Sequence, residues 1–264
     1  MKKLITLLLL ALLAGCAKEP PFDPVEKFKD AEEKMQKFKY EDARKAYQEI
    51  QEKAPDRSYD ADIMLRIADT YYGEEKYSEA LVEYQAFINF HPVHRDASYA
   101  QYQIGMCSYQ ELTTIDRDPS VTRAALKEFQ DLLVKYPGSP YEEEAKKYIA
   151  TCKERLAEYE LYVGKFYYKK GSYQAAIGRL EKLLKDYPAF SSEKDALYYN
   201  GLSYQELSEA EAGDTETGEK SRETINAEKK SRKAQALKNF ELLIAKYPDM
   251  AKKVSSRIAK LRTP

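Results

Sequence analysis

The residue best placed for covalent chemistry is Cys16, which directly follows an apolar segment at the start of the chain. Lys2 and Lys3 precede this segment, which runs from Leu4 to Leu13. It is too short to cross a bilayer, which requires about 20 apolar residues. A basic start, a short apolar core and a small residue before the cleavage point are typical of a secretory signal peptide. The alternative is an ordinary signal peptide in which the cysteine falls at this place by chance.

The end of this stretch, Leu13-Ala14-Gly15-Cys16, resembles a bacterial lipobox. The resemblance implies that residues 1–15 are removed and that Cys16 carries a diacylglycerol group on its sulfur and an acyl chain on its amino group. Two or more acyl chains anchor a protein stably, whereas one chain binds marginally. We therefore expect a lipid anchor at Cys16, with residues 16–24 as a proline-rich tether, and no other cofactor.

The remaining reactive groups form no recognisable catalytic or metal-binding motif, so we expect neither an enzyme nor a metal site. His91 and His94, the only histidines, have no cysteine or acidic cluster beside them, and no phosphate loop or serine elbow is present. Cys107 and Cys152 occupy one position of neighbouring repeats, described below, in a compartment that permits disulfides. Two buried thiols are favoured over a disulfide, because packed helix axes lie ~8–10 Å apart and a disulfide needs Cα atoms within ~7 Å.

Composition favours a helical chain without general affinity for nucleic acids. The 264 residues include only 10 glycines, and 33% are charged, which favours helices over sheets. The net charge is −1; without Lys2 and Lys3 it is −3, because 41 basic residues then face 44 acidic ones. A balance this near neutral argues against a nucleic-acid partner.

Five prolines close five copies of one pattern. Alanine lies twelve residues before each proline, a ring or leucine eight before it, and another apolar residue five before it. These offsets place one apolar stripe on a helix, and proline ends that helix because it lacks an N–H. The prolines are Pro55, Pro92, Pro137, Pro188 and Pro248; the alanines are Ala43, Ala80, Ala125, Ala176 and Ala236; and the residues eight before are Tyr47, Tyr84, Phe129, Leu180 and Phe240.

A second helix precedes each of these helices. A small residue lies 24 positions before the proline in repeats one, two and four, namely Ala31, Ala68 and Gly164. Small side chains let two helices approach closely. The pattern resembles the tetratricopeptide repeat, a helix–turn–helix unit of 34 residues. Five units cover roughly residues 25–262, and the resemblance predicts an all-α superhelical array in which stacked units bury their apolar faces.

Repeats three and five are longer than the others. Their small residues are Gly105 and Gly201, and the excess in repeat five is a charged insertion at about 208–233. It has too few apolar residues to bury a face, so it is either an extended helical hairpin or disordered. Between Tyr141 and Lys170 only Gly164 interrupts, which predicts one long helix joining an N-terminal half, 25–140, to a C-terminal half, 141–264.

The first helix of each tetratricopeptide unit lines the concave side of the array, so the template predicts a groove for an extended peptide. The chain has 23 tyrosines and no tryptophan. Tyrosine suits such surfaces because it combines an apolar ring with a polar tip. The alternative is that these rings only fill gaps between helices. The predicted groove residues are Phe28, Asp69, Tyr72, Tyr99, Tyr102 and Tyr109.

Two further stretches of sequence indicate which family of tetratricopeptide proteins this chain resembles. Arg117-Asp118-Pro119, and the segment from Lys153 to Glu160 in the predicted long helix, resemble the BamD family of tetratricopeptide lipoproteins in the β-barrel assembly machinery. The resemblance implies a scaffold on the periplasmic face of a Gram-negative-type outer membrane. It implies unfolded outer-membrane proteins as clients and the barrel-forming subunit as partner, with docking near Lys194. Ala17 follows Cys16 directly. Resemblance to lipoprotein sorting signals would link an aspartate at this position to retention in the inner membrane, and this chain has none there.

Two other classes are compatible with parts of the pattern. The first is another tetratricopeptide lipoprotein, such as a pilus-assembly pilotin or a cell-envelope coordinator. The second is an enzyme such as a peptidoglycan hydrolase, which would need a carboxylate or histidine site. The repeats leave no separate domain to hold such a site.

Overall fold

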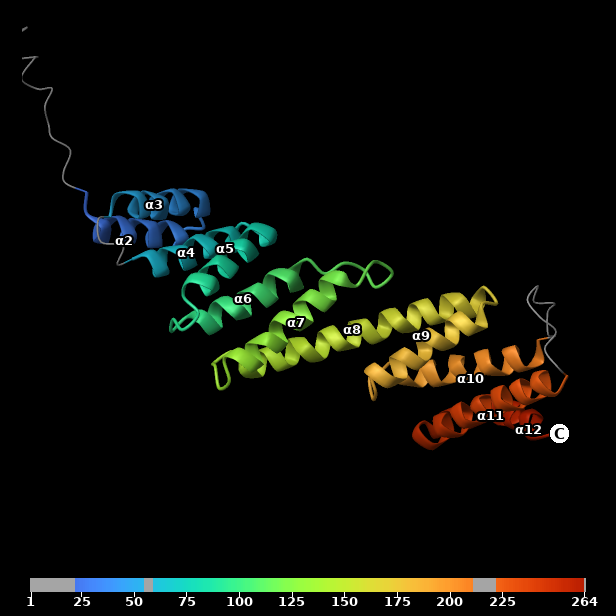
Figure 1. Ribbon diagram of the computed structural model, residues 1–264. Coiled ribbons are helices and arrows are strands. Elements are labelled where there is room, and N and C mark those ends of the chain that lie inside the picture. Colours follow the sequence, from blue (N-terminus) through green and yellow to red (C-terminus); the bar gives the residue numbers. More distant parts are fainter. Residues whose placement is uncertain (1–21, 55–58, 211–221, 264) are drawn as a thin grey trace, which may run out of the picture. The chain divides into compact units, whose positions relative to one another are not determined.

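The computed structural model describes residues 22–54, 59–210 and 222–263, which form eleven α-helices, one 3-10 helix and no strand (Figure 1). The predicted all-α tetratricopeptide array is thereby confirmed. Cys16, the signal peptide and residues 211–221 of the insertion lie outside the described residues. The helices are α2 (Pro24–Gln36), α3 (Tyr40–Lys53), α4 (Asp60–Gly73), α5 (Tyr77–Phe90), α6 (Ala97–Gln110), α7 (Ser120–Lys135), α8 (Glu142–Lys169), α9 (Tyr173–Asp186), α10 (Glu193–Glu209), α11 (Arg222–Lys246), η1 (Pro248–Met250) and α12 (Ala251–Arg262).

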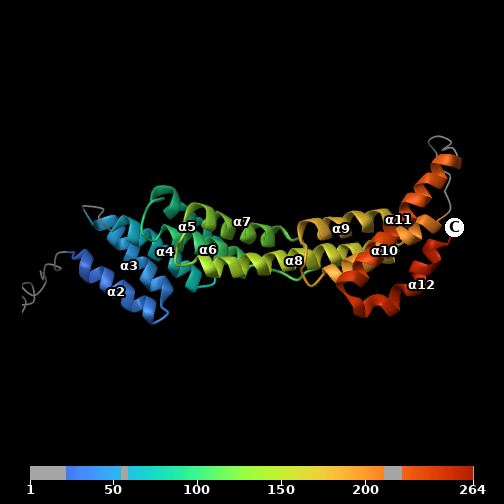
Figure 2. The ribbon, with the colours of Figure 1, turned by 90° about the horizontal axis from the view of Figure 1, so that it is seen from below.

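Consecutive helices pack in pairs, α2 with α3, α4 with α5, α6 with α7, α8 with α9 and α10 with α11 (Figure 2). The small residues lie where the two helices of a pair come closest. A Cβ on Gly105 would lie 2.6 Å from the Phe129 ring, and one on Gly201 would lie 2.5 Å from the Phe240 ring. Ala31 is fully buried at the corresponding place in the first pair. The predicted close approach is confirmed.

The turn inside several pairs is built on a left-handed residue 17 positions before the closing proline. These residues are Phe38 (φ 57°), Glu75 (φ 60°) and Gly171 (φ 74°). Glycine adopts this conformation without the steric penalty that a side chain meets. In the first turn, the amide of Lys39 donates to the Lys34 carbonyl at 2.9 Å, which closes the end of α2.

The chain divides into two compact units, residues up to His91 and residues from Pro92 onward. The predicted boundary between the two halves was 140/141. This position lies within the second unit because α8 packs on both α7 and α9. The 28 residues of α8 confirm the predicted long helix.

The insertion in repeat five is helical where it is described. Helix α10 ends at Glu209, and α11 starts at Arg222 and runs through the charged stretch. Arg232 connects this stretch to α10, because its guanidinium donates a hydrogen bond to the Leu207 carbonyl at 3.2 Å. Of the two predicted alternatives, the helical one therefore holds for residues 222–233.

A helix that the repeat pattern did not predict closes the C-terminal end. Val254, Ile258 and Leu261 of α12 are buried in one cluster with Phe240. A terminal helix of this kind covers the apolar face that the last repeat would otherwise expose. Among the described helices, none has the length and apolar character needed to cross a membrane.

Candidate functional site

The predicted groove residues of the first unit belong to a network of paired side chains. Asp69 on α4 accepts a hydrogen bond from the Tyr84 hydroxyl at 2.7 Å and pairs with Arg66 at 3.1 Å. One repeat earlier, Glu32 accepts from the Tyr47 hydroxyl at 2.5 Å, and Arg66 bridges to Glu32 at 3.0 Å. The Asp69 side chain is only 9% exposed. Its structural role was not predicted, and a direct ligand contact by Asp69 stays a prediction.

The other two predicted residues of this unit are half-buried among rings. Phe28 meets Tyr47 edge-on, with ring centroids 5.5 Å apart, and lies 6.0 Å from Tyr59. Tyr72 meets Tyr77 edge-on at 5.3 Å. These contacts fix the rings and leave part of each accessible.

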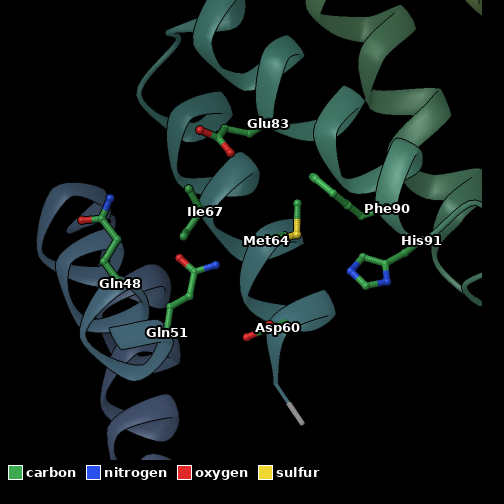
Figure 3. A pocket seen from close by; sticks show the side chains of 8 residues that line it. All are labelled: Gln48, Gln51, Asp60, Met64, Ile67, Glu83, Phe90 and His91. Atoms are coloured by element: carbon green, nitrogen blue, oxygen red, sulfur yellow. The ribbon is translucent and has the colours of Figure 1, made fainter. Parts of the chain in front are cut away.

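The first unit contains a hollow of about 510 Å³ that the sequence analysis did not find (Figure 3). Its apolar side chains are Met64 and Ile67 of α4 and Phe90 of α5, and Phe90 is 74% exposed. Its polar lining is Gln48, Gln51, Asp60, Glu83 and His91. The hollow can take an apolar side chain beside amide and carboxylate groups that hydrogen-bond to a backbone. The one signal in the sequence was the type of residue two positions before the closing proline, which is Phe90 here and a lysine or an aspartate in the other four repeats.

The predicted groove tyrosines of the second unit are part of an aromatic cluster formed by α6, α7 and α8. Tyr102 stacks on Tyr141 at 5.0 Å, and Phe129 stacks on Tyr148 at 5.1 Å. Tyr109 meets Tyr148 edge-on at 4.7 Å. The rings thus form a continuous contact between the third helix pair and the start of α8.

Burial separates these tyrosines. Tyr102 is only 9% exposed, and burial, together with the neighbouring Tyr148 and Glu144, raises its pKa well above the ordinary value. The packing alternative therefore describes Tyr102, and its predicted place on an open groove is corrected. Tyr99 and Tyr109 are half-buried. For these two, a ligand contact stays a prediction.

The loop that carries Arg117-Asp118-Pro119 packs against the long helix. Arg155 of α8 donates a hydrogen bond to the Thr113 carbonyl at the start of this loop. Asp118, just before α7, accepts a hydrogen bond from the Ser120 amide at 2.8 Å. The two stretches that carried the family resemblance also lie close together, because Arg117, Asp118 and Pro119 line one small hollow with Arg155 and Tyr159.

Lys194, the predicted docking residue, is half-buried at the start of α10. It forms an ion pair with Asp249, and its ammonium lies 5.8 Å from the centre of the Tyr247 ring. The adjacent Glu193 is 4% exposed and accepts from Lys246 at 2.5 Å and from the Tyr247 hydroxyl at 2.9 Å. This cluster joins α10 to the end of α11 and to η1.

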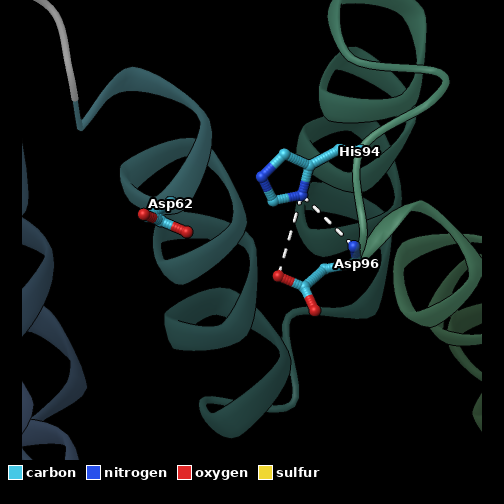
Figure 4. Close-up of side chains that lie close together, drawn as sticks. All are labelled: Asp62, His94 and Asp96. Atoms are coloured by element: carbon cyan, nitrogen blue, oxygen red, sulfur yellow. Dashed lines mark hydrogen bonds and ion pairs between the residues drawn. The ribbon is translucent and has the colours of Figure 1, made fainter.

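The two histidines have different surroundings. His91 lines the hollow of the first unit. His94 accepts a hydrogen bond from the Asp96 amide at 3.2 Å, and its Nδ1 lies 3.7 Å from the Asp96 carboxylate (Figure 4). Cys107 and Cys152 are free, buried thiols, as the sequence analysis favoured.

The paired helices and their repeat spacing define a tetratricopeptide protein, a class that acts through binding surfaces. A family described as "Outer membrane lipoprotein" (YfiO) matches residues 22–220, and the chain belongs to this family. It is 28% identical to the outer membrane protein assembly factor BamD of Vibrio cholerae over 76% of this chain and 89% of the relative. It is 27% identical to BamD of Neisseria meningitidis serogroup A over 81% and 89%. A solved tetratricopeptide protein from Parabacteroides merdae is 13% identical, with a TM-score of 0.37 over 90% of this chain and 98% of that one.

Proposed function

We propose that this chain is an assembly factor for outer-membrane β-barrel proteins, held by lipid at Cys16 on the periplasmic face of the outer membrane. The observation that carries the proposal is the family match over residues 22–220, together with relatives named as BamD that align over most of both chains. The lipobox resemblance supports the anchor. The protein performs no bond chemistry in this role.

In the proposed mechanism, the N-terminal repeats receive an extended segment of an unfolded client. The hollow between α3, α4 and α5 suits such a segment. Met64 and Phe90 contact an apolar side chain, while Gln48 and Gln51 exchange hydrogen bonds with the client backbone. An extended chain leaves its backbone groups unpaired, so amide side chains are effective partners for it.

The C-terminal repeats hold the barrel-forming subunit near Lys194. This lysine supplies a positive charge at the start of α10. Its single ammonium group cannot form the two parallel hydrogen bonds with a carboxylate that an arginine side chain would form. Charges at the rim of an interface act mainly on the association rate and its salt dependence. Lys194 therefore steers the partner more than it sets the final affinity.

Purification of the tagged lipoprotein from detergent-solubilised envelopes tests the proposed function. Recovery of the large barrel-forming subunit is the expected result. Recovery of a pilus secretin in its place would identify the chain as a pilotin and overturn the proposal.

The anchor has its own test. Cys16→Ala should release the protein from outer-membrane fractions after a high-salt wash, because no described helix can hold it in the bilayer. The unaltered chain, treated in the same way, is the control. A Cys16→Ala chain that stays with the outer membrane would show that the lipid assignment is wrong.

A further inference from the structure

A second hollow, of about 380 Å³, lies on the C-terminal part of α8. Its apolar lining is Ile115, from the loop before α7, with Leu161, Tyr162 and Phe166 of α8. Tyr162 is 49% exposed and Phe166 is 48% exposed. Single exposed apolar residues are ordinary on a protein surface. Here they converge with Ile115 in one concave space of the size that binds small ligands or single side chains.

The fold leaves this face of α8 open. Gly164 packs against Leu180 of α9, and Ala157 is fully buried in the same cluster as Leu180. Residues 162 and 166 are four apart and lie on the other side of the helix. The Arg155 hydrogen bond to Thr113 holds the loop that brings Ile115 to the hollow. The hollow is therefore formed before any partner binds.

The charges at the two ends of the hollow have opposite signs. Glu158 lines one end, and Lys165 and Lys169 line the other, at the C-terminus of α8. Lys165 is paired with Asp195 at 3.2 Å. The next residue, Lys170, places its ammonium 5.8 Å from the centre of the Phe166 ring. Lys169 and Lys170 are both exposed.

We propose that this hollow binds an extended segment of a protein partner that carries an aromatic side chain followed by acidic residues. The aromatic side chain fills the space between Ile115 and Phe166. The acidic side chains pair with Lys169 and Lys170. Because the lysines lie at the C-terminal end of α8, the acidic side chains lie at that end of the hollow. This site goes beyond the proposed function and lies in different helices from the hollow lined by Met64 and Phe90.

The aromatic ring and the lysines contribute to binding in distinguishable ways. An aromatic side chain that fills a preformed pocket is the usual anchor of a peptide interface. Exposed lysines add attraction that salt screens over about 10 Å at 0.1 M ionic strength. Loss of the ring should therefore weaken binding at every salt concentration, whereas loss of the lysines should weaken it mainly at low salt.

The test measures fluorescence anisotropy of short labelled peptides with the mature lipoprotein in phospholipid nanodiscs. The first peptide has one phenylalanine followed by two glutamates in a Gly-Ser background. Two further peptides replace the phenylalanine by alanine or the glutamates by glutamines. We expect saturable binding of the first peptide, about tenfold weaker binding without its ring, and a smaller, salt-dependent loss without its acids.

Variants of the protein complete the test. Phe166→Ala and Ile115→Ser should each weaken binding of the first peptide about tenfold, and Lys169→Glu with Lys170→Glu should weaken it at low salt. Phe38→Ala, which removes a 77% exposed ring from the first unit, is the matched control and should bind like the parent. Unchanged far-UV circular dichroism shows that the variants fold. The proposal would be overturned if the first peptide showed no saturable binding. It would also be overturned if Phe166→Ala and Ile115→Ser both bound this peptide as tightly as the parent does.

Discussion

Gly164 and Gly178 lie in the same pair of helices but in opposite surroundings. A Cβ on Gly164 of α8 would lie 2.7 Å from Leu180, whereas a Cβ on Gly178 of α9 would meet nothing within 4 Å. Glycine within a helix costs about 0.5–1 kcal/mol relative to alanine. At Gly164 this cost is offset by the close approach of the two helices, and at Gly178 it is not.

Alanine at these two positions should therefore have opposite effects. Gly164→Ala should lower the free energy of unfolding by about 1–3 kcal/mol, because the methyl group forces the helices apart. Gly178→Ala should raise it by about 0.5–1 kcal/mol. Urea unfolding followed by circular dichroism measures both. A Gly164→Ala protein as stable as the parent would show that the two helices are less tightly packed than described.

The two buried thiols should be unreactive in the folded protein. Burial raises the pKa of the Cys107 thiol to about 12 and that of Cys152 to about 11. Because the thiolate is the nucleophile, both residues stay protonated and unreactive at pH 8. A Cys16→Ala chain should react slowly with a thiol reagent at pH 8 and completely in urea. Fast reaction without denaturant would contradict the burial of these residues.

Sequence spacing predicted the apolar contacts at residue level better than the polar ones. In repeats one, two and four, the small residue and the large residue eight before the proline recur at fixed offsets, so their contact follows from helix geometry. The pairs Tyr84–Asp69 and Lys194–Asp249 depend on distances between helices that the spacing does not give. Tyr102 was misplaced for a related reason, because the template does not show that Tyr141 and Tyr148 cover it.

Among the elements, the joint between α10 and the end of α11 depends on one buried carboxylate. Burial alone would raise the pKa of Glu193, but the hydrogen bonds from Lys246 and Tyr247 outweigh it, so the pKa is lowered from 4.5. A carboxylate with a depressed pKa contributes stability above the pKa of the unfolded chain. That contribution is lost as the pH falls through the folded-state pKa.

Glu193→Gln should remove this contribution. We expect the free energy of unfolding at pH 7 to fall by roughly 1–3 kcal/mol, because Lys246 and Tyr247 lose a charged acceptor. The difference from the parent should shrink as the pH falls below about 4.5. Glu223→Gln, at an exposed carboxylate in the first turn of α11, is the matched control. A difference that stays constant from pH 7 to pH 3 would contradict the role of the Glu193 charge.

Most of the charged insertion should be dispensable for folding. Residues 222–228 have no buried side chain, and the first buried residue of α11 is Ala236. Deleting residues 212–228 keeps Arg232 and should leave the thermal midpoint nearly unchanged. Circular dichroism measures the helix content. A loss of helix larger than the deleted turns would show that the insertion supports α10.

The elements differ in how far the sequence predicted them. Helix α8 was predicted because only Gly164 interrupts a long stretch without proline. Helix α12 was missed because it follows the last closing proline and repeats no earlier offset. The hollows beside Phe90 and Phe166 were also missed, since a concave surface depends on side chains from several helices.

For the molecule as a whole, Lys194 has two roles: it belongs to the proposed docking surface for the barrel subunit, and it forms an ion pair that stabilises the fold. Lys194→Glu reverses a rim charge, but it also breaks the ion pair with Asp249. A slower association with the periplasmic region of the barrel subunit could then follow from either effect. Exchanging the two charges, with Lys194→Asp and Asp249→Lys, keeps an ion pair at this place.

We expect Lys194→Glu to slow association with the barrel subunit, most clearly at low salt. The exchanged pair should recover the thermal midpoint of the parent but not its association rate, if the charge at position 194 steers the partner. Stopped-flow or biosensor kinetics at two salt concentrations measure the rate. An association rate equal to the parent's for both variants would exclude this surface as the docking face.

The length of α8 also determines the angle about the helix axis between the side chains at its two ends. Its first half packs on α7 and its second half on α9, so one uninterrupted backbone determines the rotational phase between these two neighbours. Each residue of an α-helix turns the backbone by about 100° and advances it by about 1.5 Å. An insertion or deletion of one residue within α8 would therefore rotate the open face at Tyr162 and Phe166 out of line with Ile115. The number of residues in α8 is therefore constrained as strictly as the identity of Gly164.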